Sequence, residues 1–406
     1  MRLGLLGSDR GIADVAAAAV RRGDRFALAC GVDEGVARAC GATPTASWQP
    51  LLDAGVCDAV LVGADGWNAE RAEAVRMLVQ AGRPLVLAQP LELSMLWAYE
   101  LDMIRRDTGS LLVPCLPDRL HPFIARLRAT VVDAAAGVAT VGTIEAMHLE
   151  RRMPDRSQDR VLAALSRDAD LVRAIAGDPA RISTLGGAGD NAWATLAVGL
   201  TGPAHLPVRW QVAPGAEPGL AIRLQGSTGT LVVEAPDDSS RPWTWAWGDA
   251  RDSLAFDRGA AVLGVLDARL SPSAGVPAPA DAATWNDAAR AIELAETVPR
   301  SLAKGRAIDL HREEFSEIGT FKGTMASLGC GLIMLALVVV VAATLVAGIA
   351  REFGWKAAGG VADAWPVLVL AVLGVFLVLQ LIPLLVGDAR GDDEADGPPA
   401  DAPPRP

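Results

Sequence analysis

Along the first hundred residues, short apolar runs alternate with stretches whose apolar residues recur at helical spacing. This pattern predicts strands at residues 2–6, 26–30, 59–62 and 85–87, and helices at residues 12–22, 34–40 and 69–81. Strands that alternate with such helices are typical of an α/β fold with a parallel, doubly wound sheet. In these sheets a ligand binds beyond the carboxyl ends of the strands, where the strand order reverses.

Two long uncharged runs follow near the end of the chain, at residues 323–350 and 364–387. Each exceeds the roughly 20 apolar residues that a helix needs to cross the hydrocarbon core of a bilayer. They predict two transmembrane helices, at about 328–350 and 364–386, in preference to a pair of buried core helices. Because only a short segment joins them, we expect a hairpin with both ends on one side of the membrane.

Three observations predict the orientation of this hairpin. The apolar start of the chain soon meets Asp9 and Arg10 and does not resemble a secretory signal. The five cysteines show no disulfide or metal spacing. More basic residues flank the terminal side of the hairpin, at Arg306, Arg312, Lys322 and Arg390, than its loop, at Arg351 and Lys356. We therefore expect the inner (cytoplasmic) membrane, with the large N-terminal part and both termini in the cytoplasm.

The composition adds two constraints. The mean hydropathy of +0.28 is high for a protein of 406 residues, and the two uncharged runs account for much of it. The net charge of −11 supplies no basic surface for phosphates, so nucleic acid is not an expected partner. Residues 311–327 are expected to form a juxtamembrane linker, and the acidic, proline-rich residues 388–406 a disordered tail.

The first strand-to-helix turn contains Gly7, Ser8, Asp9, Arg10 and Gly11. A dinucleotide fingerprint needs a glycine at its second position, so that the backbone can approach the pyrophosphate at the helix N-terminus. Here Asp9 holds that position and places a carboxylate at the expected phosphate site. By itself the turn is a weak motif, and an ordinary strand-to-helix turn is the alternative.

Further motifs occur in order along the chain, and together they resemble the Gfo/Idh/MocA family of NAD(P)-dependent oxidoreductases. The resemblance covers about residues 1–310, and its motifs lie at residues 57–62, 81–94, 119–123, 170–177, 190–191, 225–231 and 287–306. It implies a Rossmann domain over residues 1–118 and an α+β domain over residues 119–310, whose open sheet is mostly antiparallel. It also implies NAD or NADP as the cofactor and a sugar-like ligand as the substrate.

The same resemblance assigns positions to the site. The cofactor would contact Gly7, Ser8, Asp9, Arg10, Gly11, Asp33, Ala64, Gln89 and Pro90. The family's catalytic lysine, aspartate and histidine positions hold Gln89, Ala163 and Arg167, and only the later acid, Asp170, remains. Hydride transfer from an alcohol needs a base, which neither the Gln89 amide nor the Arg167 guanidinium supplies.

Two hypotheses follow. The first is a membrane-anchored homologue with lost or altered catalysis that acts as a ligand sensor or a scaffold, and this hypothesis leaves open whether the cofactor still binds. The second is an active sugar or polyol dehydrogenase whose acid/base residues have moved, with His148 and Glu150 on a strand near the cleft as candidates. The alternative for His148 is a strand histidine that its neighbours satisfy.

Partners are predicted from the remaining patterns. Trp243, Trp245 and Trp247 fall on one face of a strand, which favours a dimer contact over a core-facing strand or a sugar-stacking platform. We therefore expect the lipid bilayer, a second copy of the chain through the second-domain sheet, and a small sugar-like ligand as partners. The sequence shows no zinc-site motif, so no metal is expected.

Overall fold

The computed structural model describes residues 1–186, 192–202, 206–271 and 279–310, together with Leu345 and Glu352. Contacts divide the chain into two compact units, Met1–Arg312 and Glu313–Pro406. The predicted linker, membrane hairpin and tail lie outside the described residues, apart from Leu345 and Glu352. Within the described stretches, no helix combines the length and apolar character that a membrane span requires.

The first sheet is parallel and has the strand order β3-β2-β1-β4-β5-β6. Its strands are β1 Arg2–Leu6, β2 Arg25–Cys30, β3 Thr43–Thr45, β4 Ala59–Val62, β5 Leu85–Leu87 and β6 Leu112–Pro114. Its helices are α1 Arg10–Arg22, α2 Glu34–Ala39, α3 Ala69–Gln80 and α4 Met95–Thr108, with a 3-10 turn, η1, at Gln49–Leu52. The predicted doubly wound sheet is confirmed, and its order reverses between β1 and β4.

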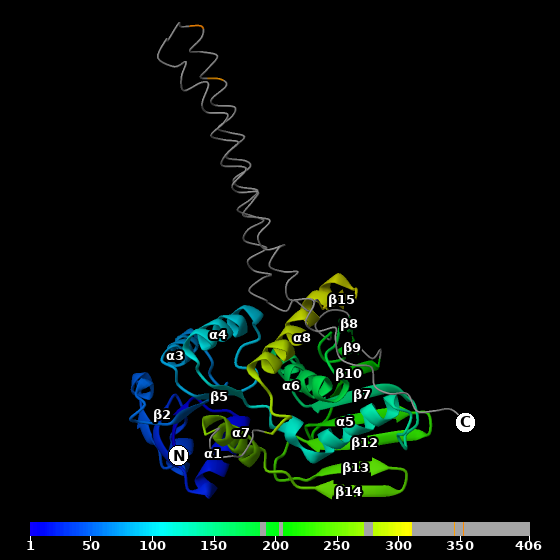
Figure 1. The fold of residues 1–406 in the computed structure, drawn as a ribbon, viewed down its shortest axis with the longest axis horizontal. Helices are drawn as coiled ribbons and strands as arrows, with labels where there is room; N and C mark the ends of the chain where they lie inside the picture. Colours follow the sequence, from blue (N-terminus) through cyan, green and yellow to red (C-terminus); the bar gives the residue numbers. More distant parts are fainter. Residues whose placement is uncertain (187–191, 203–205, 272–278, 311–344, 346–351, 353–406) are drawn as a thin grey trace, which may run out of the picture. The chain divides into compact units, whose positions relative to one another are not determined.

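Burial on both faces explains why the central strands are so apolar. All four residues of β4 and all three of β5 are buried, as expected for a parallel sheet that helices cover on both sides. Figure 1 shows α1 on one side of this sheet and α3 with α4 on the other. The carboxyl ends of β1 and β4 therefore meet at the edge where a ligand would bind.

The second sheet has nine strands in the order β14-β13-β12-β11-β7-β10-β9-β8-β15. Only β7 and β10 pair in parallel among these neighbours, so the expected mostly antiparallel sheet is confirmed. The strands are β7 Ile144–Met153, β8 Arg181–Leu185, β9 Ala197–Thr201, β10 Pro207–Pro214, β11 Gly219–Gly226, β12 Gly229–Pro236, β13 Trp243–Trp247, β14 Ala250–Leu254 and β15 Ile308–Asp309.

Helices cover one face of the second sheet. They are α5 Pro122–Ala135, α6 Gln158–Ala176 and the second half of α8 Trp285–Lys304, and a 3-10 turn, η2 at Pro117–Leu120, precedes α5. Along β7, Met147, Leu149 and Arg151 are buried under these helices. Because side chains alternate along a strand, His148 and Glu150 lie on the opposite, uncovered face.

The tryptophans of β13 lie on the covered face. Trp243 and Trp245 are only 2% and 3% exposed. The His121 ring stacks on Trp243 with centroids 4.1 Å apart, and Phe123 of α5 packs on Trp245 at 5.6 Å. The interpretation of these indoles as a dimer contact is therefore wrong, because α5 and its leading turn cover them. The core-facing alternative is the correct one for both residues.

Two later helices connect the second half of this unit to the first sheet. Helix α7, Arg258–Leu270, packs against α1 and contributes Val262, Leu263, Val265 and Leu266 to the first core. Helix α8 contributes Trp285, Ala288 and Ile292 to the first core, and Ala291, Leu294, Ala295 and Val298 to the second. A single helix thus takes part in both hydrophobic cores.

The contact between α1 and α7 gives a test of this packing. A Cβ atom on Gly259 would lie 2.1 Å from the Asp14 carbonyl oxygen, so we expect Gly259→Val to separate the helices and destabilise the protein by about 1–3 kcal/mol. Gly264, on the same helix, faces open space, and Gly264→Ala should stabilise by about 0.5–1 kcal/mol. Chemical denaturation of the purified variants measures both changes in the free energy of unfolding. Equal changes for Gly259→Val and Gly264→Ala would contradict the packing of α7 against α1.

Candidate dinucleotide crevice and buried polar cluster

In a doubly wound sheet the binding crevice is expected at the strand-order reversal, which here falls between two loops, residues 7–11 after β1 and residues 63–65 after β4. Asp9 is the N-cap of α1, and its carboxylate accepts hydrogen bonds from Ile12 N at 2.9 Å and Ala64 N at 2.8 Å. A helix N-terminus binds anions through such free N–H groups. At this one, the carboxylate of Asp9 already holds the position of the anion.

The two loops also contact each other directly. Asp65 N donates to the Ser8 carbonyl oxygen at 2.9 Å. A Cβ atom on Gly63 would lie 2.3 Å from Ser8 Cα, so only glycine allows this approach. The backbone of the β4 loop therefore rests against the fingerprint loop.

Arg71 of α3 fills the space above the fingerprint glycine. Its guanidinium donates to the carbonyl oxygens of Asp65, of Gly63 at 3.4 Å and of Gly31 at 3.5 Å. A Cβ atom on Gly7, which has a φ of 71°, would lie 2.5 Å from Arg71 Nη1. The surface that a dinucleotide would cover in this fold is thus covered by an arginine.

The other residues predicted to hold the cofactor have different contacts. Asp33 caps α2 by accepting from Gly35 N at 2.7 Å. Arg10 is exposed and points toward Asp238, with an Nη2–Oδ1 distance of 3.9 Å. In this arrangement the Asp9 carboxylate takes one N–H group of the α1 N-terminus, and the Arg71 guanidinium lies over Gly7, so both side chains would have to move before a dinucleotide could lie here.

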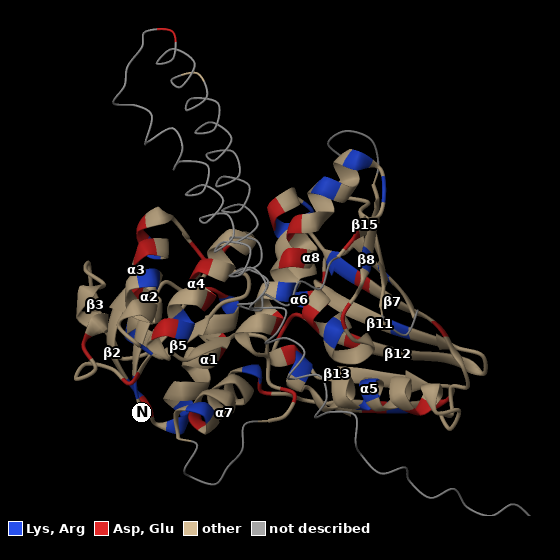
Figure 2. Cartoon of the chain, turned by 45° about the horizontal axis from the view of Figure 1, so that its top comes forward, with Lys and Arg blue, Asp and Glu red and all other residues tan. Residues whose placement is uncertain are grey.

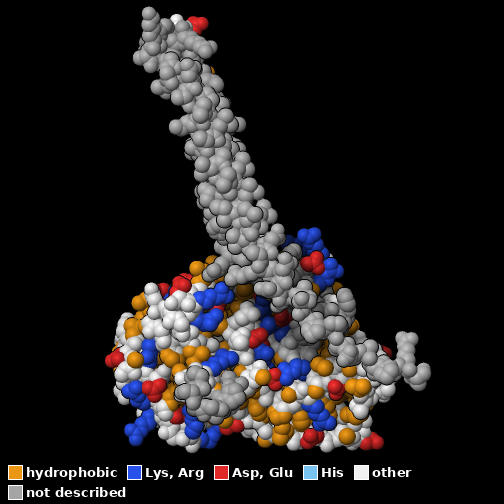
Figure 3. Space-filling model, in the orientation of Figure 1, with side chains coloured by type: hydrophobic (Ala, Val, Ile, Leu, Met, Phe, Trp, Pro, Cys, Tyr) orange, Lys and Arg blue, Asp and Glu red, His pale blue; other side chains and the backbone are white. Residues whose placement is uncertain are grey.

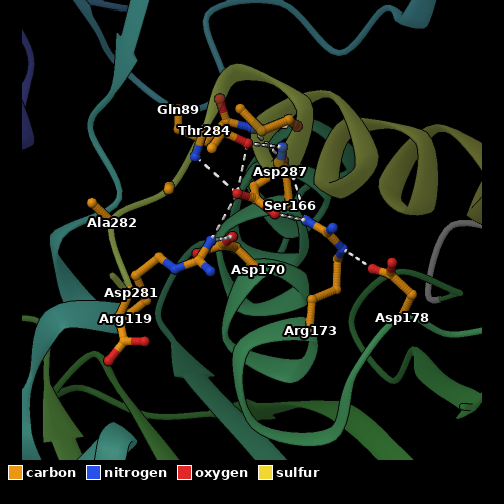
Figure 4. Close-up of polar contacts among 12 residues, drawn as sticks. Gln89, Arg119, Ser166, Asp170, Arg173, Asp178, Asp281, Ala282, Thr284 and Asp287 are labelled. Atoms are coloured by element: carbon orange, nitrogen blue, oxygen red, sulfur yellow. Dashed lines mark hydrogen bonds and ion pairs between the residues drawn. The ribbon is translucent and has the colours of Figure 1, made fainter. Parts of the chain in front are cut away.

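A buried polar cluster lies beside this crevice and consists of Gln89, Arg119, Ser166, Asp170, Arg173 and Asp287 (Figure 4). Gln89, which precedes the cis-proline Pro90, is only 7% exposed. Its amide nitrogen donates to Ser166 Oγ of α6 at 3.3 Å and to the Ala288 carbonyl oxygen of α8 at 3.1 Å. Both amide hydrogens are therefore used within the protein, at the position to which the sequence resemblance assigned a lysine.

Asp170 is the buried acid of the cluster and is 1% exposed. Its Oδ1 accepts from Arg119 Nη1 at 2.8 Å, while Oδ2 has no hydrogen-bond partner among the described residues. Burial raises the pKa of Asp170 to about 6, and the nearby Arg119 and Arg173 limit this increase. The acid predicted as the surviving catalytic group is therefore held in an internal ion pair.

The remaining charges of the cluster hold the start of α8. Asp287 forms a capping box with Thr284 and also contacts Arg173 at 3.1 Å and Arg119 at 3.5 Å. Arg173 in turn pairs with Asp178. Two guanidiniums and two buried or half-buried carboxylates thus link η2, α6 and α8.

The alternative acid/base candidates lie elsewhere. Glu150 is on the uncovered face of the second sheet, where Gln211 Nε2 lies 3.3 Å and Arg223 Nη1 3.6 Å from its carboxylate. His148 is two residues before it on the same strand face. On α6, Ala163 is half-buried and Arg167 is exposed. The structure therefore brings Gln89 close to α6, which lies on the covered face of the second sheet. It places His148 and Glu150 on the opposite, uncovered face.

Sequence reasoning missed Arg71, Arg119 and Ser166. One signal was available for Arg71, which lies in the first turn of α3. A cation in the first turn of a helix opposes the helix dipole, so its presence there suggests another interaction.

Among the described residues, no group of three or more His, Cys, Asp or Glu side chains is arranged to hold a metal ion.

Comparisons with solved structures agree with this description of the fold. Myo-inositol dehydrogenase from Corynebacterium glutamicum ATCC 13032 has 16% identity and a TM-score of 0.58 over 77% of this chain and 99% of that one. Levoglucosan dehydrogenase, in complex with NADH and levoglucosan, has 11% identity and a TM-score of 0.59 over 77% and 100%. Biliverdin reductase from Synechocystis sp. PCC 6803, with biliverdin and NADP+, has 18% identity and a TM-score of 0.54 over 74% and 98%.

No family model matches the sequence, and no curated protein matches it. The structural likenesses therefore show the fold, which this chain shares with these dehydrogenases. The sequence resemblance predicted this fold for about residues 1–310, and the matched share of the chain agrees with that range.

The buried acid predicts a specific pH dependence. Since the folded state raises the pKa of Asp170 to about 6, it binds a proton before the unfolded chain does as the pH falls. The free energy of unfolding of the wild type, minus that of Asp170→Asn, should therefore increase by about 1–3 kcal/mol between pH 7 and pH 4.

Asp281 provides the matched control. Its hydrogen bond with Arg128 lowers its pKa, so the corresponding difference for Asp281→Asn should shrink as the pH falls below about 4. Denaturant titrations between pH 7 and pH 4 measure the difference for Asp170→Asn, and titrations continued below pH 4 measure the difference for Asp281→Asn. A difference for Asp170→Asn that does not change with pH would contradict the raised pKa.

Proposed function

We propose that this chain is a non-catalytic protein of the Gfo/Idh/MocA dehydrogenase fold, tethered to the inner membrane by its C-terminal segment, where it works as a scaffold. The observation that carries this proposal is the occupied crevice. The carboxylate of Asp9 accepts from Ile12 N and Ala64 N, which could otherwise donate to a phosphate, and Arg71 covers the glycine on which the dinucleotide would lie. Nucleotide sensing through this crevice is disfavoured for the same reason.

The buried polar cluster supports the same proposal. Hydride transfer from an alcohol requires a base beside the reacting carbon. Here Gln89 is turned onto α6 and α8, and Asp170 is paired with Arg119. An active dehydrogenase with His148 or Glu150 as the base is disfavoured, because both side chains lie on the uncovered face of the second sheet.

That uncovered face is our proposed contact for a second copy of the chain or another protein. Its side chains are mainly polar, with Glu150, Arg209, Gln211, Arg223 and Gln225 among them. A polar face of this kind suits a non-obligate interface, which is about as polar as the rest of a protein surface. The membrane tether rests on the two uncharged runs of the sequence, and the dehydrogenase fold has no need of them.

Cofactor titration tests the absence of catalysis. We expect the purified full chain to show no saturable change in fluorescence with NADH or NADPH up to about 1 mM, the upper end of ordinary KM values. Levoglucosan dehydrogenase serves as the positive control. The double variant Asp9→Gly/Arg71→Ala should gain measurable binding, whereas Arg76→Ala, on the same helix but paired with Glu73 and Glu100, should not.

Two results would count against this proposal. Saturable binding by the wild type, together with cofactor reduction in the presence of a polyol, would overturn it. A double variant that still fails to bind would show that Asp9 and Arg71 do not cause the loss of binding.

Cysteine labelling tests the proposed orientation. Cys40 is partly exposed, whereas Cys30, Cys57 and Cys115 are buried. In bacterial spheroplasts that express the full chain, we expect a membrane-impermeant maleimide to label Cys40 only after permeabilisation, with Cys40→Ser as the control. Labelling of Cys40 in intact spheroplasts would place the first unit outside the cytoplasm.

A further inference from the structure

The described part of the first unit ends beside the last turn of α8. Strand β15 pairs with β8 through Ile308 and Ile182, and Leu310 N donates to the Ala180 carbonyl oxygen at 2.8 Å. The chain therefore leaves the unit from the edge of the second sheet. Residues 311–406 therefore follow directly from this edge of the sheet.

Basic side chains gather at this exit. Arg300, Lys304 and Arg306 are exposed, and none of the three has an ion-pair partner among the described residues. Figure 2 shows blue Lys and Arg segments at the end of α8 near β15, and Figure 3 shows a group of Lys and Arg side chains at the upper right of the unit. Asp309, an acid at the same edge, is bonded to Arg181 at 2.6 Å.

An exposed apolar residue lies next to these cations. Leu185, the last residue of β8, is 73% exposed. The glycine that follows it touches α8, since a Cβ atom on Gly186 would lie 3.1 Å from Leu302 Cδ1. A single cation in the last turn of a helix is ordinary, because it favours the helix dipole. Three unpaired cations with an exposed leucine beside them exceed what capping α8 requires.

We propose that this patch, consisting of Arg300, Lys304, Arg306 and Leu185, rests on the anionic phospholipid headgroups of the membrane. The proposal depends on the membrane tether proposed above. Between Leu310 and the uncharged run that starts at residue 323 there are twelve residues, which span at most about 43 Å when fully extended. The patch therefore stays within reach of the bilayer that this run would enter.

The chemistry of the patch fits that surface. Arginine and lysine near a leaflet rich in anionic lipid are attracted to it, and this attraction falls off within a Debye length. The apolar Leu185 can enter the boundary between headgroups and acyl chains while the cations remain at the level of the phosphates. The contact would fix which edge of the unit faces the membrane and leave the uncovered sheet face available to a protein partner.

The distribution of lysines makes the contact measurable. The whole sequence contains only three lysines, at positions 304, 322 and 356, and Lys304 alone belongs to the patch. Full-length chain is reconstituted into phosphatidylcholine vesicles with or without phosphatidylglycerol. The rate at which a neutral amine-reactive reagent labels Lys304 is then followed by mass spectrometry.

We expect labelling of Lys304 to be on the order of fivefold slower in vesicles that contain phosphatidylglycerol. This is about the factor by which one cation strengthens binding to an anionic surface. High salt should abolish the difference. The double variant Arg300→Glu/Arg306→Glu should also lose it, whereas Arg25→Glu, an exposed arginine at the start of β2, should retain it.

Flotation of the same vesicles separates the two proposals. If the chain does not float with the vesicles, the membrane tether itself is wrong. If it floats and Lys304 reacts at the same rate with both lipid compositions, the tether stands and the headgroup contact is wrong.

Discussion

The burial of α8 between two hydrophobic cores is the constraint on which the rest of the first unit depends. One stripe of this helix packs with the parallel sheet and another with the nine-stranded sheet. Apolar burial stabilises each contact by about 25 cal/mol per Å², so neither sheet can move freely without exposing part of α8. Asp287, the acid in the first turn of this helix, is half-buried and pairs with Arg119 and Arg173.

This constraint gives the polar cluster its character. A buried carboxylate is tolerated when a guanidinium pairs with it, and breaking such a pair is costly because it leaves an uncompensated charge. The charges of the cluster therefore depend on one another, because removing any one of them would deprive its partner of an ion pair. They are Asp170, Arg119, Arg173 and Asp287. In a working dehydrogenase of this fold, polar groups at these positions would need to be available to a substrate. Here their hydrogen-bonding capacity is largely used inside the protein.

Much of the fold could be predicted from the sequence, because the relevant signals are local. The predicted strands 2–6, 59–62 and 85–87 match β1, β4 and β5, whereas the three-residue strands β3 and β6 and the helix α4 were not predicted. The faces of the second sheet were harder. Trp243 and Trp245 have the same period-2 pattern whether a helix or a second protein covers them, and only the position of α5 decides between the two.

The positions of the substituted site residues could be predicted from the sequence, but the contacts of their side chains could not. The substitutions at Gly7–Gly11 and at Gln89 indicated altered chemistry from the sequence. Arg71 is far from these residues along the chain, and nothing in its local pattern says that its guanidinium reaches Gly7 and Gly31. The partners of Gln89 on α6 and α8 are likewise set by the packing of distant helices, which no short window of sequence contains.

The occupied crevice also has a consequence for how stability responds to metabolism. A protein that binds a cofactor only when folded gains stability in proportion to the logarithm of cofactor concentration over Kd. Under the function proposed above, a chain that supplies its own anion and its own cation at that position would have no such dependence. Its folded population would stay constant while the nucleotide pools of the cell change, which suits a component whose task is to be present and not to report.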